Sequence, residues 1–158
     1  MINALIVWLI FVAAVAVLCL AKPNTGCIFI GLFFLAMAIG VSIVLALTIP
    51  QSYIDMGKSA LMPFFRKFIL NVVAPNPALL VLLAAVSQIA IGLLILNKKN
   101  NVKTGLAGGI VFTSAIIPLG IEELPNPISA LAQAYLLTKE FDKTFLEIQN
   151  SKYKKEVF

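Results

Sequence analysis

Histidine is absent from this 158-residue sequence, and cysteine occurs only twice. Without histidine, the chain has no imidazole to ligate haem or zinc and no base for a Ser-His or Cys-His catalytic pair. Cys19 and Cys27 are eight positions apart, so they do not form a CxxC redox pair, and two thiols are too few for a metal cage. We therefore predict no catalytic residues and no metal site, and the sequence indicates no cofactor.

Charged residues are also scarce. They make up 12% of the chain, whereas 61% of it is hydrophobic; in a soluble domain about a quarter of the residues are charged. The formal net charge of +5 is typical of loops that meet anionic headgroups, and we do not interpret it as nucleic-acid binding. The composition predicts an all-helical integral membrane protein, with the lipid bilayer as a partner.

Five apolar segments contain no Asp, Glu, Lys or Arg. They are Ala4–Ala21, Cys27–Ile49, Ala78–Leu96, Gly105–Ile121 and Pro125–Thr138. The last is short for a full span, so a re-entrant or interfacial helix is an alternative there. Between the second and third segments, Phe64–Val73 predicts an interfacial helix from which Arg66 and Lys67 reach the headgroups. We expect a bundle of five hydrophobic helices, four full spans plus a short fifth, over residues 1–138, followed by a basic amphipathic tail, 139–158.

The basic residues predict the orientation. With five spans, nine of the twelve basic residues fall on one side of the membrane. They are Lys22, Lys98, Lys99, Lys103, Lys139, Lys143, Lys152, Lys154 and Lys155. For a multi-pass protein of the cell membrane, the positive-inside rule then places the N-terminus outside and the C-terminus in the cytoplasm. With four spans, the loop around Lys98 would fall on the wrong side.

Small residues and Pro-Asn pairs predict details of the helices. Gly105 with Gly109, and Ala36 with Gly40, are small residues four positions apart, a spacing that lets helix backbones approach in lipid. We favour packing within the chain over a dimer interface, which leaves a homo-oligomer open. The asparagines of the three Pro-Asn pairs are expected to mark helix starts as N-caps. They are Asn24, Asn76 and Asn126.

Four residues are candidates for binding a ligand: Gln88, Glu122, Glu123 and Tyr135. Gln88 lies in the middle of an apolar segment, where an amide must find partners; an interhelical hydrogen bond and a ligand contact are the two interpretations. The two glutamates lie in a Pro- and Gly-rich turn that, together with the interfacial helix, predicts a polar mouth, although solvated loop charges are the alternative. Since no predicted span contains a charged residue, a proton-coupled pump is disfavoured.

Three stretches, Gly31–Gly40, Pro75–Leu96 and Leu106–Phe112, resemble the DoxX-like family of small polytopic membrane proteins. In that family a span reading roughly E-x-x-x-G-x-L-L precedes a basic turn, and here Gln88–Leu94 has that form with Gln88 in place of the glutamate. The resemblance covers about Gly31–Leu137. It implies a small accessory protein or subunit, in some members associated with quinone-dependent sulfur oxidation, and in many others without a known activity.

Two other functions stay open. The chain is also suited to bind a lipophilic ligand (a quinone, a sterol or a lipid) in a pocket between helices. An enzyme acting on such a ligand would have only Glu122 or Glu123 as its acid or base. A small transporter is the third possibility. We favour a non-catalytic accessory protein that binds a membrane protein partner.

Overall fold

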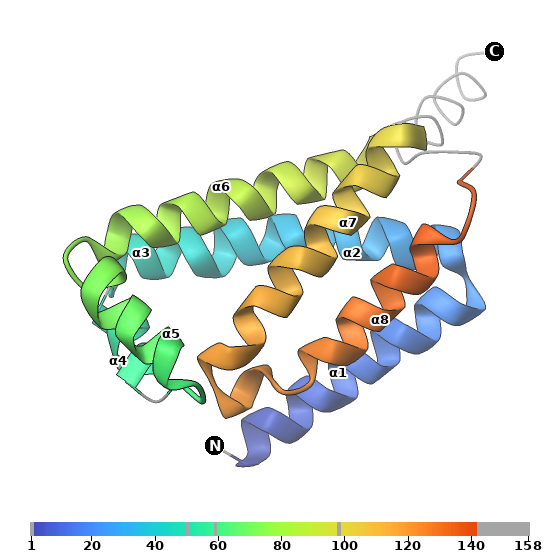
Figure 1. The fold of residues 1–158 in the computed structure, drawn as a ribbon. Coiled ribbons are helices and arrows are strands. Elements are labelled where there is room, and N and C mark those ends of the chain that lie inside the picture. Colours follow the sequence, from blue (N-terminus) through green and yellow to red (C-terminus); the bar gives the residue numbers. More distant parts are fainter. Residues whose placement is uncertain (1, 50, 59, 98, 142–158) are drawn as a thin grey trace.

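The computed structural model describes residues 2–49, 51–58, 60–97 and 99–141. Within these ranges the regular structure is entirely helical, so the prediction of an all-helical fold is confirmed. The long helices are α1 (Ile2–Ala21), α2 (Pro23–Met37), α6 (Pro77–Leu96), α7 (Lys99–Ile116) and α8 (Asn126–Leu137). A π-helix, η1 (Ala38–Ile43), continues α2 into α3 (Val44–Thr48), so that the three form one rod (Figure 1).

Among the described residues, three helical stretches are long and apolar enough to cross a membrane: Pro23–Thr48, Pro77–Leu96 and Asn100–Leu119. A bilayer core of about 30 Å needs about 20 helical residues, and these three meet that length. The apolar part of α1, Leu5–Ala21, is shorter, and α8 has 12 residues. The structure is therefore compatible with a multi-pass membrane protein.

The helices pack pairwise around one core. The α2–α3 rod lies beside α6, α7 packs against α6 and α8, and α8 also packs against α1 (Figure 1). A buried apolar cluster gathers near the end where α1 turns into α2 and α6 into α7. Its members are Cys19, Cys27, Ile30, Phe34, Ile91, Ile95, Val102, Leu106, Ala132, Leu136 and Phe141. Both cysteines are free thiols inside this core.

The Gly105 and Gly109 pair packs within the chain, as the sequence predicted. A Cβ atom on Gly105 would lie 2.6 Å from the backbone nitrogen of Ile95, so glycine is what lets α7 approach α6. A Cβ atom on Gly109 would collide with Oε1 of Gln133 in α8. These two glycines therefore bring α7 close to both of its neighbours.

A pair of short helices lies at one end of the bundle (Figure 1). They are α4 (Gln51–Lys58) and α5 (Pro63–Phe68), and a second π-helix, η2 (Ile69–Val73), extends α5. A helix thus covers 63–73, where the sequence predicted one, whereas α4 was not predicted. The backbone N–H of Leu61 donates a hydrogen bond to the carbonyl of Pro118 at 3.0 Å. That bond fastens the pair to η3 (Ile117–Leu119), which follows α7.

Helices begin at all three Pro-Asn pairs, but only one asparagine is an N-cap. The Asn76 side chain accepts a hydrogen bond from the backbone N–H of Leu79 at 3.4 Å, and α6 starts at the next residue. At the other two pairs the cap prediction is wrong. Lys22 and Pro125 hold the cap positions of α2 and α8. Pro23 takes the first helical position of α2, which moves Asn24 inside the first turn. The side-chain amide of Asn126 donates a hydrogen bond to the carboxylate of Glu123.

The tail prediction is only partly covered. Phe141 is described and lies buried in the core. The rest of the predicted amphipathic tail, 142–158, lies outside the described residues.

Candidate functional site

The first buried polar contact joins the π-helix to α6. The Ser42 hydroxyl donates a hydrogen bond to Oε1 of Gln88 at 2.8 Å, and both side chains are buried. The π-helix places Ser42 and Ala38 inward, which brings the hydroxyl opposite the amide. Gln88 therefore makes an interhelical hydrogen bond, one of its two expected roles, and its contact with a ligand stays a prediction.

The second buried polar contact joins α7 to α8. Gln133, only 1% exposed, donates from Nε2 to the Thr113 hydroxyl at 3.3 Å and lies 3.5 Å from the Ser129 hydroxyl. Its Oε1 atom is buried and accepts no hydrogen bond from the part of the chain that the structure describes. An unsatisfied buried acceptor costs about 1–3 kcal/mol. Gln133 is therefore the polar residue of the bundle whose role most needs an explanation.

Sequence reasoning gave Gln133 and Thr113 no role. Both were visible as polar residues within apolar segments, as were Ser42 and Ser129. The signal that could have selected them is the spacing of four between Ser129 and Gln133, which puts both on one helical face.

The predicted acidic mouth is partly described. Glu123 belongs to η4 (Ile121–Glu123), and one of its carboxylate oxygens accepts a hydrogen bond from the Asn126 amide. Asn126 is itself buried in the first turn of α8. The side chain of Glu122 lies outside what the structure describes. Glu123 is thus tied to the start of α8.

Tyr135 lies near the other end of α8. The ammonium of Lys139 sits 4.5 Å from the centroid of its ring. Along the helix axis, about 14 Å separates Tyr135 from Asn126, the residue that binds Glu123. The structure therefore keeps two of the predicted ligand-binding residues, Glu123 and Tyr135, at opposite ends of one helix.

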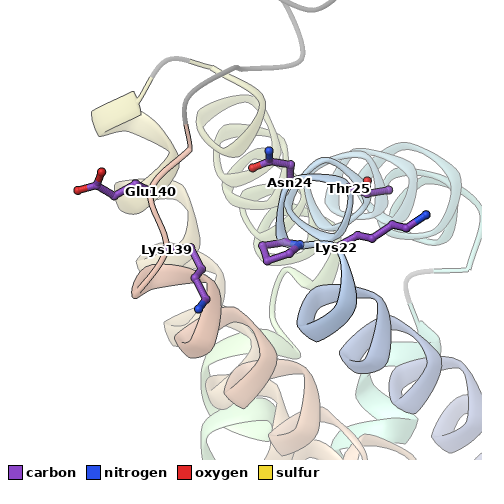
Figure 2. Close-up of a pocket in the computed structure, with 6 residues that line it drawn as sticks. Lys22, Asn24, Thr25, Lys139 and Glu140 are labelled. Carbon is purple, nitrogen blue, oxygen red and sulfur yellow. The ribbon is translucent and has the colours of Figure 1, made fainter.

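A cavity that was not predicted lies beyond Tyr135. It has a volume of about 450 Å³ and opens between the α1–α2 turn and the end of α8 (Figure 2). Its lining residues are Lys22, Pro23, Asn24, Thr25, Lys139 and Glu140. Figure 2 shows the Lys139 side chain running back along α8, with Lys22 extending away from it and Glu140 turned outward. The residues come from segments far apart in the sequence, which is why no local motif announced the cavity.

An exposed surface on the α2–α3 rod is the last feature of note. Ala36, Gly40, Val44 and Leu47 are all exposed, and we call them the Gly40 face. A Cβ atom built on Gly40 would meet nothing within 4 Å. The Ala36 and Gly40 pair therefore does not bring two helices of this chain together.

Among the described residues, no three or more Cys, Asp or Glu side chains gather in a way that could hold a metal ion. The chain matches no family model, no curated protein and no solved structure. The resemblance to DoxX-like proteins therefore stays a prediction.

Proposed function

We propose that this chain is a small accessory subunit of a membrane complex, DoxX-like and without catalysis of its own. In the proposed topology α1, the α2–α3 rod, α6, α7 and α8 lie in the bilayer, and α5 with η2 lies at the interface. The N-terminus is outside and the C-terminus cytoplasmic. In support, the α1–α2 turn, the α6–α7 turn and the end of α8 lie toward the same end of the bundle (Figure 1). Lys22, Lys103 and Lys139 belong to that end, as the positive-inside rule requires of a cytoplasmic side.

The Gly40 face carries the proposal. Glycine inside a helix is less stable than alanine by about 1 kcal/mol. Gly105 and Gly109 lie where a Cβ atom would collide with a neighbouring helix, but no such contact explains Gly40. In lipid, small residues four apart let a second helix approach closely. Gly40 also lies within a π-helix, a feature frequent at functional sites. A partner's transmembrane helix seated on the Gly40 face accounts for both observations.

The experiment compares bulky substitutions on two exposed helix surfaces. Gly40→Leu fills the Gly40 face, and Ala90→Leu makes a similar change at an exposed position of α6. Each full-length protein is extracted into lipid nanodiscs and its composition measured by native mass spectrometry. We expect a stoichiometric partner protein with the wild type and with Ala90→Leu, and its loss with Gly40→Leu. Thermal melting should be the same for both variants.

Three outcomes would contradict the proposal. A wild-type chain that is extracted without a partner would remove the accessory role. A partner that stays bound to Gly40→Leu would show that the interface lies elsewhere. A partner lost equally from both variants would mean that the change in bulk, and not the Gly40 face, is responsible.

A second proposal is that the chain binds a lipophilic ligand that carries a hydroxyl, such as a quinol, a sterol or a lipid. The unsatisfied Oε1 of Gln133 supports it, because a ligand hydroxyl would supply the missing donor. In the same native mass spectra we expect such a ligand on the wild type and its loss from Gln133→Leu. A lone chain without ligand would contradict this second proposal.

A further inference from the structure

The cavity between the α1–α2 turn and the end of α8 has the chemistry of an anion site. Two of its six lining residues are lysines, and Asn24 and Thr25 add polar groups at the start of α2. Glu140 is the one acidic residue of the lining, and it is turned outward from the other labelled side chains (Figure 2). The lining therefore offers more positive than negative charge to an occupant.

Neither lysine is neutralised within the described structure. The ion pair that the described residues form is between Lys58 and Asp55, at the far end of the bundle. The Lys139 ammonium is held over the Tyr135 ring, 4.5 Å from its centroid, and not against a carboxylate. Lys22 is exposed, and its flexible four-carbon stem lets its ammonium swing toward the cavity.

The cavity lies where the apolar helices end. α1 ends at Ala21 and α8 at Leu137, and charged residues follow each within two positions. Beneath it the bundle is closed, since Cys19 and Leu136 are fully buried and Phe141 nearly so. An occupant therefore rests at headgroup depth and does not enter the core.

The last turns of α1, which lead to the cavity-lining Lys22, carry exposed apolar side chains. Leu20 and Val17, one turn apart, are 57% and 62% exposed. They lie directly before the Lys22 turn, so a molecule with an anionic head in the cavity could lay its chains against them. A free anion would make no use of this surface.

We propose that this cavity binds the phosphate of an anionic phospholipid, with its acyl chains along Val17 and Leu20. Lys139 and Lys22 attract the negatively charged phosphate electrostatically. This attraction weakens as salt is added, because salt screens the charges. The proposal does not depend on the Gly40 face or on any protein partner.

The test uses the delipidated full-length protein in mild detergent. Native mass spectrometry measures its affinity for phosphatidylglycerol and for phosphatidylcholine of equal chain length. Wild-type protein should prefer phosphatidylglycerol, and Lys22→Gln with Lys139→Gln should lower that affinity by about 30-fold. As a control of equal charge change, Lys67→Gln with Lys103→Gln removes two exposed lysines outside the cavity. This control should retain the preference.

The charge-conserving pair, Lys22→Arg with Lys139→Arg, guards against a loss of fold and should also retain the preference. Equal loss in the cavity and control pairs would overturn the proposal, because net charge alone would then explain binding. So would a wild type without preference for phosphatidylglycerol. Displacement of the lipid by millimolar inorganic phosphate would likewise overturn it, since the cavity would then be a site for the free anion.

Discussion

Replacing Gly109 by alanine would test how α7 and α8 are joined inside the bundle. The added Cβ atom would collide with Oε1 of Gln133 and lie 3.3 Å from a ring carbon of Phe34. Gln133 is almost fully buried, so its amide has little space into which to withdraw. If it moves, its hydrogen bond to Thr113 lengthens or breaks.

The expected magnitude is the difference of two effects. Overpacking a buried site costs about 1–3 kcal/mol, whereas replacing glycine by alanine in a helix gains about 1 kcal/mol. We therefore expect Gly109→Ala to lower the free energy of unfolding by about 0–2 kcal/mol, in place of the gain of about 1 kcal/mol that the helix propensity alone would give. The measurement is unfolding by a denaturing detergent in mixed micelles, followed by circular dichroism.

Two further variants complete the test. In a Gln133→Ala background the obstruction is gone, so adding Gly109→Ala should be neutral or stabilising; this cycle isolates the contact between the two residues. Gly40→Ala is the matched control, because its Cβ atom meets nothing within 4 Å and only the gain in helix propensity remains. If Gly109→Ala and Gly40→Ala had the same effect, or if Gln133→Ala did not change the effect at position 109, the reasoning would be refuted.

Two more predictions concern buried groups. Ser42→Ala leaves Oε1 of Gln88 without its donor and should lower the free energy of unfolding by about 0.6–1.7 kcal/mol, measured by the same detergent titration; the same loss in a Gln88→Leu background would contradict the hydrogen bond. Cys19 and Cys27 are free and buried, so neither should react with N-ethylmaleimide in mild detergent and both should react after denaturation, as read from the intact mass. Modification of either thiol in the folded protein would show that α1 and α2 open at that end.

The sequence allowed the helical segments to be predicted because charges interrupt them. The absence of charge in Ala78–Leu96 predicted α6 to within one residue at its start and at its end. Charge marks where a chain leaves the bilayer but not where a helix begins, so α2 starts at Pro23, ahead of the predicted Cys27. For the same reason α7 starts at Lys99, within the stretch expected to be a turn.

The interior contacts could not be predicted in the same way. In a helix that is apolar on all sides, the pattern of apolar residues does not show which side faces inward. Gln133 and Gln88 therefore looked alike in sequence. Only packing shows that Oε1 of Gln88 has a hydroxyl donor, while Oε1 of Gln133 has no donor within the described structure. Lys22 and Lys139 line the same cavity, and only the docking of α8 beside α1 brings these two residues together.

The π-helix in the middle of the α2–α3 rod has a consequence for the whole rod. Each residue of an α-helix turns the chain by about 100°, so one extra residue in a turn rotates everything beyond it by about that angle. The side of α3 that meets α6 is therefore offset around the axis from the side that an uninterrupted α2 would have presented. Deleting a single residue from Ala38–Ile43 would reverse this offset, swing Ser42 away from Gln88 and turn the last helical turn of the rod to a different side. The rod thus turns one side toward α6 along α2 and a side offset from it toward α6 along α3.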